Sequence, residues 1–179
     1  MKLQIKINPL NLKLTISTTI FLISSIVNLS AQSSNYYDFK SLKYSYTVQI
    51  PVGFEIQKAD SKNIDLKAVH NLGHSVLVNV TNRLPEEYSI TAHDYTAEFL
   101  ENTLKQVNPY YKIFKSEKII IDGQKAFLVY HTNRDVNLTR IECYIYNKDY
   151  AYLLSGTAKS NEFSRFENDF LYFIKSIKF

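Results

Sequence analysis

The sequence has little cysteine and little glycine, and each shortage excludes common kinds of functional site. Cys143 is the single cysteine among 179 residues, so the chain forms no internal disulfide and carries no paired cysteines for a structural zinc site. The four glycines are isolated from one another along the chain, which excludes a glycine-rich phosphate-binding loop. Nucleophile-elbow and His-Glu-x-x-His motifs are also absent. The common enzyme classes are therefore disfavoured, and no cofactor is expected.

Cys143 lies in a segment that alternates apolar residues with a period of two. The alternation places it on the same side as Ile141 and Ile145. A reactive thiol needs a partly exposed, electropositive setting. Cys143 is therefore predicted to be a small buried hydrophobic residue rather than a nucleophile.

Residues 1–31 have the three-part pattern of a secretory signal peptide. Residues 1–13 carry Lys2, Lys6 and Lys13 with no acid, residues 14–27 are apolar but diluted by serine and threonine, and Ala31 ends a small-residue exit. The apolar run is shorter than the roughly 20 residues that a spanning helix needs. We predict cleavage after Ala31 and export to the periplasm or beyond the cell, without a stable membrane anchor. An uncleaved N-terminal anchor is the alternative.

Loss of the signal peptide removes most of the chain's basic character. The full chain has 21 Lys and Arg against 17 Asp and Glu. Since the signal contains three lysines and no acid, 18 basic residues then face 17 acidic ones. Nucleic-acid binding requires a dense basic stripe, so a nucleic-acid partner is not expected.

The first part of the mature chain reads as strands. Residues 32–41 are interpreted as a polar N-terminal tether. Period-2 alternation then predicts strands at 44–50 and 54–56, separated by Pro51-Val52-Gly53. Two more strands, at 64–70 and 76–80, flank an Asn71-Leu72-Gly73 turn.

A helix is predicted at residues 91–107. Thr91 can cap its first turn and Asp94 complements the positive end of the helix dipole. Three- and four-residue steps define one apolar face, and Asn108-Pro109 ends the helix. The face consists of Ala92, Tyr95, Phe99, Thr103 and Val107, with Leu100 and Leu104 beside it.

Two hairpins and a closing helix complete the chain. Asp122-Gly123 suits a type I′ turn between strands 111–121 and 124–131, which pairs Ile119 with Ala126 and Lys118 with Phe127. Because both faces of the returning strand are apolar, the sheet should be covered locally on both sides. A second hairpin joins 138–146 to 150–158. Ser160 is expected to cap a final helix whose buried stripe is Phe163, Phe166, Phe170 and Ile174.

The order of these elements indicates an α+β fold, an antiparallel β-sheet flanked by helices, over a single domain of residues 42–179. The strings Pro51-Val52-Gly53-Phe54, Asp122-Gly123, residues 152–158 and residues 173–179, with the mid-chain helix, resemble the PsbP-like domains. That family has an α/β/α sandwich shared with a nuclear Ran-binding factor. The resemblance implies a non-catalytic accessory or binding domain. Phe54 stands where the family commonly has tryptophan.

His70 and His74 flank the Asn-Leu-Gly turn and are the candidate metal ligands. On a tight hairpin the two rings can converge on one ion, with Asp65 in the preceding strand as a further ligand. The competing interpretation is a pair of exposed turn residues. His131, which follows Phe127 and Val129 on one strand face, is interpreted as a strand-end histidine rather than a base.

Four tyrosines surround the last hairpin turn: Tyr144, Tyr146, Tyr150 and Tyr152. A three-residue loop, 147–149, pairs Tyr146 with Tyr150 and Tyr144 with Tyr152 on one face. If exposed, this ladder is a recognition surface, and if covered by a helix it is core. A two-residue loop splits the four tyrosines between the faces.

The sequence therefore favours an exported, non-enzymatic domain, expected to be monomeric, that binds an unknown protein or small ligand. Two alternatives remain open at this point. One is a hydrolase or transferase with an unfamiliar site, which should show buried polar residues converging in one cleft. The other is a metal-binding protein that uses His70 and His74.

Overall fold

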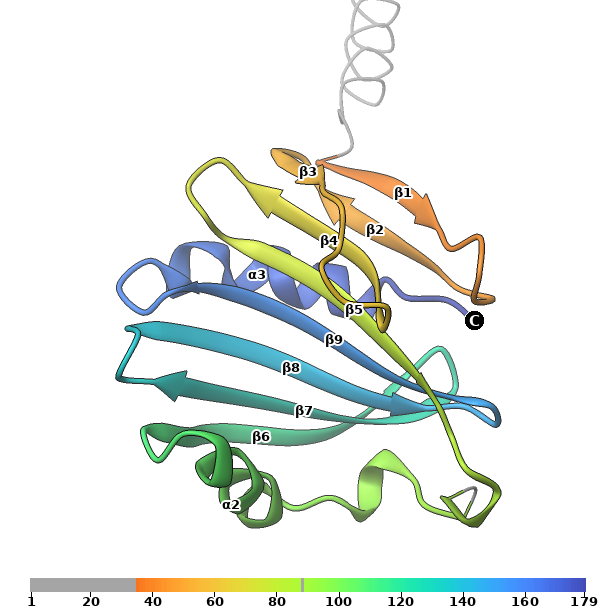
Figure 1. Cartoon of the computed structure of the whole chain (residues 1–179). Coiled ribbons are helices and arrows are strands. Elements are labelled where there is room, and N and C mark those ends of the chain that lie inside the picture. The colour runs from red at the N-terminus through yellow and green to blue at the C-terminus, as the bar shows by residue number, and fades with distance from the viewer. Residues whose placement is uncertain (1–34, 88) are drawn as a thin grey trace, which may run out of the picture. The chain divides into compact units, whose positions relative to one another are not determined.

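The computed structural model describes residues 35–87 and 89–179, and the predicted signal peptide lies outside them. Residues 36–179 form one compact unit. Its centre is a seven-stranded antiparallel sheet of order β3-β4-β5-β9-β8-β7-β6, and a separate pair, β1 and β2, lies beside it (Figure 1). The strands are β1 (Tyr36–Lys40), β2 (Thr47–Pro51), β3 (Phe54–Ile56), β4 (Ile64–His70), β5 (Ser75–Asn82), β6 (Tyr111–Ile121), β7 (Gln124–Asn133), β8 (Leu138–Tyr146) and β9 (Tyr150–Lys159).

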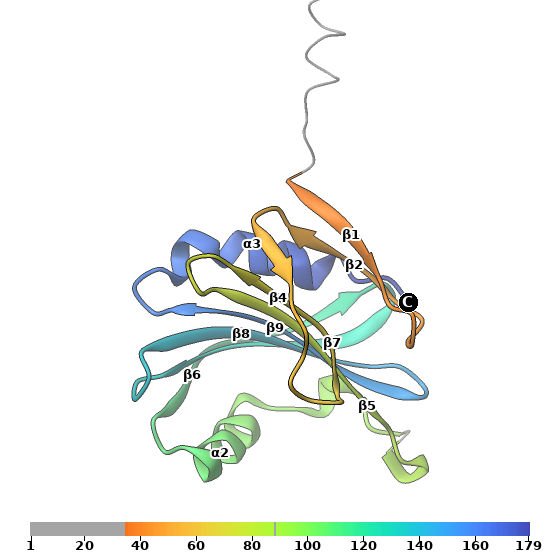
Figure 2. The same cartoon turned by 45° about the horizontal axis from the view of Figure 1, so that its top comes forward.

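Two helices lie on opposite faces of this sheet, as Figures 1 and 2 show. The helices are α2 (Ala97–Val107) and α3 (Phe163–Lys175), with short 3-10 turns η1 (Pro85–Glu87) and η2 (Ala92–Asp94). Neither helix of the described chain has the length and apolar character needed to cross a bilayer. The predicted α+β architecture, with an antiparallel sheet between helices, is confirmed.

The prediction that residues 32–41 form a polar N-terminal tether has to be corrected. Within residues 32–41, the segment Tyr36–Lys40 forms β1 and pairs with β2 along its whole length. Two aromatic side chains hold it: Tyr36 stacks on Tyr172 with ring centroids 3.8 Å apart, and Phe39 packs against the main core. The segment lacks the period-2 alternation that marks a strand, and its stabilising partners come from β2 and α3.

Helix α3 covers one face of the sheet as predicted. Its stripe of Phe163, Phe166, Phe170 and Ile174 is buried, together with Phe173. The helix begins at Phe163 rather than after Ser160, since the Ser160 hydroxyl accepts a hydrogen bond from Thr139 instead. Cys143 is fully buried beneath this helix face, and burial raises the pKa of its thiol, which confirms the prediction of an inert cysteine.

The helix on the opposite face differs from its prediction. The chain is helical at η2, extended at Tyr95, and helical again from Ala97, with the Thr96 side chain accepting the Phe99 N–H. Because the helix is interrupted at Tyr95 and Thr96, the residues of α2 point in other directions than in one continuous helix. The predicted apolar face, which was counted continuously from Ala92, is therefore wrong. Leu100 contacts the sheet, whereas Phe99 and Val107 are exposed.

The hairpin prediction around Asp122-Gly123 is confirmed. Both residues have positive φ, +47° and +77°, as a type I′ turn requires. The register pairs Ile119 with Ala126 and Lys118 with Phe127. All residues from Ala126 to His131 are buried, so both faces of β7 are covered.

Candidate functional site

The candidate metal ligands lie together on the β4–β5 hairpin. The His70 and His74 rings stack with centroids 5.7 Å apart, and the His74 ring packs on Phe166 at 4.0 Å. His74 is only 1% exposed, so the interpretation as an exposed turn residue is wrong for it. The Asp65 carboxylate instead accepts a hydrogen bond from Tyr46. Within residues 35–87 and 89–179, no three acidic, histidine or cysteine side chains are grouped as metal ligands.

The His74 ring is a buried base without hydrogen bonds from its two nitrogens. Burial lowers its pKa, an effect that the Glu162 carboxylate, 3.6 Å from Nε2, only partly opposes. His70, Arg165 and Lys159 lower the pKa further. The unfolded chain therefore binds a proton at a pH where the folded protein does not, and acidification favours unfolding.

We expect the stability of the protein to fall as pH drops below about 6.5, the ordinary histidine pKa. His74→Leu removes the titrating group and keeps an apolar side chain against Phe166. Urea unfolding between pH 7 and pH 5 should give a smaller loss of stability for this variant than for the parent. Equal losses in the two proteins would contradict the assignment to His74.

The four hairpin tyrosines do not share a face. The Asn147 N–H bonds to the Tyr150 carbonyl, so the loop is the two-residue Lys148-Asp149 and Tyr144 pairs with Leu153. The predicted pairings Tyr146–Tyr150 and Tyr144–Tyr152 are wrong. The register was set by the Asn147 side chain, whose Oδ1 accepts the N–H groups of Asp149 and Tyr150.

Each pair of tyrosines instead joins the packing on its own side. Tyr144 and Tyr146 both contact the ring of Tyr95 on the α2 side. On the α3 side, Tyr150 contacts Tyr44, and the buried Tyr152 contacts Tyr46. The ladder that would form a recognition surface is not assembled.

A buried polar cluster lies on the α2 side of β7 and β8. Glu142, which is 4% exposed, accepts hydrogen bonds from Arg140 at 3.2 Å and from the Tyr144 hydroxyl at 2.9 Å. His131 Nε2 lies 3.3 Å from the same carboxylate, an ion-pair distance without hydrogen-bond alignment. Burial alone raises the pKa of Glu142, but His131, Arg140 and Tyr144 outweigh burial and hold it below its ordinary value.

This buried cluster is what an unfamiliar enzyme would show, but it has no room for a substrate. The cavity beside His131 and Arg140 has a volume of about 20 Å³. That is the space of a single water molecule. In the sequence, the one feature that indicates the cluster is an acidic residue within an alternating strand, because Glu142 stands between Ile141 and Cys143. The cluster is therefore best explained as an internal charge network.

A larger depression lies between the β1–β2 hairpin and the C-terminal end of α3. It consists of two hollows of about 380 and 420 Å³ that share Thr47 and Lys178, a size typical of ligand sites. We call it the hairpin groove. It is lined by Asp38, Lys40, Ser41, Leu42, Lys43, Tyr44, Ser45, Tyr46, Thr47, Val48, Gln49, Tyr172, Lys175, Ser176, Lys178 and Phe179.

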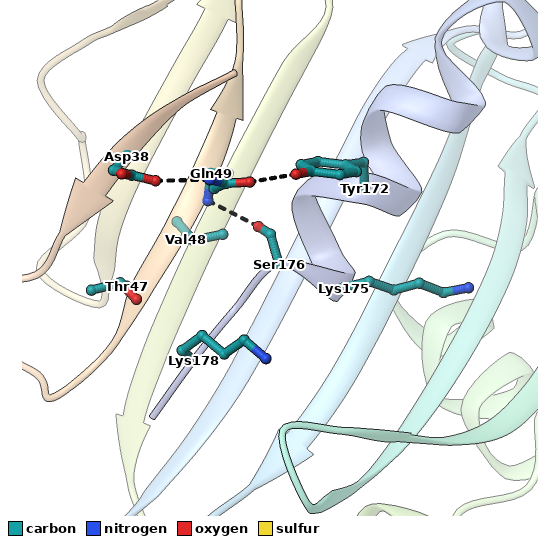
Figure 3. A pocket seen from close by; sticks show the side chains of 8 residues that line it. All are labelled: Asp38, Thr47, Val48, Gln49, Tyr172, Lys175, Ser176 and Lys178. Carbon is teal, nitrogen blue, oxygen red and sulfur yellow. Dashed lines mark hydrogen bonds between the residues drawn. The ribbon is translucent and has the colours of Figure 1, made fainter. Parts of the chain in front are cut away.

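Gln49 ties the first hollow together, as Figure 3 shows. Its side-chain amide donates to Asp38 at 2.9 Å and accepts from the Tyr172 hydroxyl, and its backbone N–H donates to Ser176 Oγ at 2.9 Å. Thr47 and Lys178 exchange two backbone hydrogen bonds of 2.9 Å. These contacts join β2 to the end of α3 and fix the position of the Lys178 backbone.

The second hollow combines positive charge with exposed apolar surface. Lys40, Lys43 and Lys178 line it, and Leu42 at the bend between β1 and β2 is fully exposed. The Lys43 ammonium lies 4.8 Å from the centroid of the Tyr44 ring, and its interaction with the Tyr44 side chain raises its pKa. Sequence reasoning missed this groove because its lysines come from residues 40–43 and 178, which no motif connects.

No protein-family model matches the sequence, and no curated protein matches it. Solved structures do match its fold. Cyanobacterial PsbP (CyanoP) from Synechocystis sp. PCC 6803 has a TM-score of 0.62 at 12% identity, with 83% of this chain and 94% of that chain covered. The Saccharomyces cerevisiae Ran-binding protein Mog1p gives 0.56 at 12% identity, with coverages of 81% and 95%.

LpqN, described as involved in cell envelope biogenesis of Mycobacterium tuberculosis, gives a TM-score of 0.55 at 7% identity, with 82% and 86% of the two chains covered. At sequence identities of 12%, 12% and 7%, the likeness of this chain to the three proteins concerns the fold. The chain has the PsbP-like fold that its sequence resembles.

Proposed function

We propose that the protein is an exported, non-catalytic binding domain whose hairpin groove holds an acidic, amphipathic segment of a partner protein. The observation that carries the proposal is the combination of three lysines and a fully exposed leucine around one hollow. Ammonium groups attract carboxylates, and an exposed large apolar side chain next to them favours contact with apolar residues of a partner. An acidic segment with interspersed leucines satisfies both.

The immediate surroundings of the groove support this electrostatic choice. Asp38 is hydrogen-bonded to Gln49, and Asp122, which lies outside the groove, is 3.4 Å from the Lys178 ammonium. Lys40 and Lys43 are both exposed and have no carboxylate within ion-pair distance in the described chain. A ligand carboxylate would therefore displace no acid from either lysine, although the Lys43 ammonium already contacts the Tyr44 ring.

The non-catalytic part of the proposal is supported by where the chemically capable groups lie. The Cys143 thiol is buried, and the Glu142 cluster is enclosed beside a cavity the size of one water molecule. The polar groups that line the hairpin groove are lysines, hydroxyls, Gln49 and one aspartate, Asp38, which accepts a hydrogen bond from the Gln49 side-chain amide. They include no paired nucleophile and base. This lining is suited to recognition.

The export part rests on the signal pattern of residues 1–31. Cleavage after Ala31 would leave residues 32–35 ahead of β1, so the cut would spare the first strand. N-terminal sequencing of the exported protein is expected to begin at Gln32. Recovery of an intact segment 2–31 would overturn the assignment.

Binding at the groove is tested with the peptide Ac-Glu-Leu-Glu-Leu-Glu-NH₂ added to ¹⁵N-labelled protein. We expect chemical-shift changes of the amides at residues 40–47 and 178. The dissociation constant should be about tenfold larger for Lys43→Glu, because this substitution removes a favourable charge contact and adds a repulsive one. Lys58→Glu, an exposed site outside the groove, makes the same charge change and should alter the constant less than about twofold.

Two results would contradict the groove as the binding site. One is an equal loss of affinity in the Lys43 and Lys58 variants, which would mean that only net charge matters. The other is equal binding of the lysine peptide Ac-Lys-Leu-Lys-Leu-Lys-NH₂, which would remove the electrostatic argument.

A further inference from the structure

Strand β6 forms a long edge of the sheet. In the described chain β7 is its only strand neighbour, whereas the opposite edge, β3, has just three residues (Figures 1 and 2). An edge strand presents backbone N–H and C=O groups that can pair with another extended chain. The central residues of β6, from Phe114 to Lys118, are all exposed.

The tight turn after β6 determines which backbone groups face outward. In a two-residue hairpin the residues flanking the turn, here Ile121 and Gln124, bond to each other. Alternate residues of an antiparallel strand then point their backbone groups away from the partner strand. Counting back from Ile121, the outward positions are Ser116, Lys118 and Ile120.

The beginning of β6 is already closed, which limits the open stretch. The Tyr111 N–H donates to the Asn108 carbonyl at 3.3 Å, and the Ile113 N–H donates to Glu101 Oε2 at 2.8 Å. The register then shifts between Ile113 and Lys115. In the described part of the chain, no hydrogen bond beyond the β7 ladder reaches the N–H groups of the three later outward residues.

The open stretch has a charge that selects its occupant. Lys118 lies on it, and Lys125 lies opposite Ile120 on β7. Lys115 precedes the stretch, with its ammonium 4.5 Å from the centroid of the Tyr130 ring. Glu117 is the one acid of β6, and Asp94 of η2 interacts electrostatically with Lys118 and Lys125. Antiparallel pairing of two β6 edges through their outward groups would set Lys118 against Lys118, which disfavours a second copy. The same lysines attract an acidic chain. Ile120, 61% exposed, offers an apolar contact beside them.

We propose that an acidic, extended segment of a partner protein adds to β6 as a further strand along Ser116–Ile120. This goes beyond the hairpin groove, since it uses different residues and backbone pairing rather than a hollow. Main-chain hydrogen bonds would supply affinity, and the lysines together with Ile120 would select alternating acidic and apolar side chains.

Hydrogen exchange of ¹⁵N-labelled protein tests the proposal with the strand-forming peptide Ac-Glu-Val-Glu-Val-Glu-Val-Glu-NH₂. We expect exchange of the Ser116, Lys118 and Ile120 amides to slow about tenfold or more when the peptide is bound. The lysine counterpart of the peptide should leave these rates unchanged. Shifts confined to residues 40–47 and 178 would place the peptide in the hairpin groove and overturn strand addition without affecting the proposed function.

Two variants separate backbone pairing from charge. Lys118→Pro removes an outward N–H that the β7 ladder does not use, and should weaken binding about tenfold or more. Lys118→Glu keeps the N–H and should reverse the preference toward the lysine peptide. Unchanged acidic-peptide affinity and preference in Lys118→Glu would overturn the proposal even if the proline variant folds poorly.

Discussion

Replacing Phe170 with alanine is expected to lower the free energy of unfolding by about 3–5 kcal/mol, the usual range for a phenylalanine removed from a core. Phe170 is fully buried at the middle of α3, and its ring contacts those of Phe54, Phe163 and Phe166. The alanine leaves a cavity between helix and sheet that these rings cannot fill without leaving their own contacts. Chemical denaturation of the variant and the parent measures the difference.

Gly156 on β9 lies directly against the Phe170 side chain. Gly156 on β9 has no room for a side chain, because an added Cβ would lie 2.3 Å from the Phe170 ring. Gly156→Ala should therefore destabilise the protein by about 1–3 kcal/mol through overpacking. Phe170→Ala removes the Cγ and Cδ1 atoms, which lie 2.3 and 2.7 Å from that added Cβ, but keeps the Cβ at 2.6 Å, so the substitution relieves part of the clash. The double variant should be more stable than the sum of the two single changes predicts, with a coupling of about 0.5–3 kcal/mol.

An exposed position on the same helix is the control. Asn168→Ala should change stability by no more than about 0.5 kcal/mol, since its side chain faces solvent. Glu167 is less suitable because it is half-buried and interacts with Tyr130. Similar midpoints for Phe170→Ala and the parent would mean that α3 does not pack on the sheet.

Replacing Glu142 with alanine is expected to destabilise the fold by about 3 kcal/mol or more, the range for removing one partner of a buried ion pair. The substitution leaves the Arg140 Nη1 group and the Tyr144 hydroxyl without their acceptor and the His131 ring beside a void. Glu142→Gln keeps the shape and one oxygen, so its loss should be smaller. Glu55→Ala, at an exposed glutamate of β3, should stay within about 0.5 kcal/mol.

The same carboxylate predicts a dependence on acid. The folded-state pKa of Glu142 lies below its ordinary value, so its contribution to stability is complete above about pH 4.5 and is lost as pH falls. Urea unfolding at pH 6 and pH 3.5 should show a smaller loss in Glu142→Gln than in the parent. If Glu142→Ala unfolds at the parent's midpoint, the network does not stabilise the fold.

The elements of the fold could be predicted where the signal was local. Asp122-Gly123 determined a turn type, and the turn type determined the register of β6 with β7, because a two-residue loop with positive φ leaves one pairing. The phenylalanine stripe of α3 likewise repeats at helical spacing and identified the buried face. In both cases the physics acts between residues that are close in sequence.

Two predictions of packing faces failed because a side-chain cap close in sequence was missed. The break at Tyr95 and Thr96 rotated α2 against the sheet, and one asparagine side chain moved the pairing of the last hairpin by one residue. In the candidate site a contact distant in sequence decided the outcome. His74 read as an exposed turn residue, because nothing near it in the sequence shows that Phe166 covers it.

By itself, the sequence determined an antiparallel sheet with a phenylalanine-faced helix, since alternation, turn chemistry and helical spacing are properties of short segments. Only the tertiary structure decided which polar residues meet. Glu142 lies beside His131 because β7 and β8 pair in one register, and Lys43 lies near Lys178 because β2 pairs with the end of the chain. Such contacts depend on the summed packing of the whole core, and no local pattern of residues encodes them.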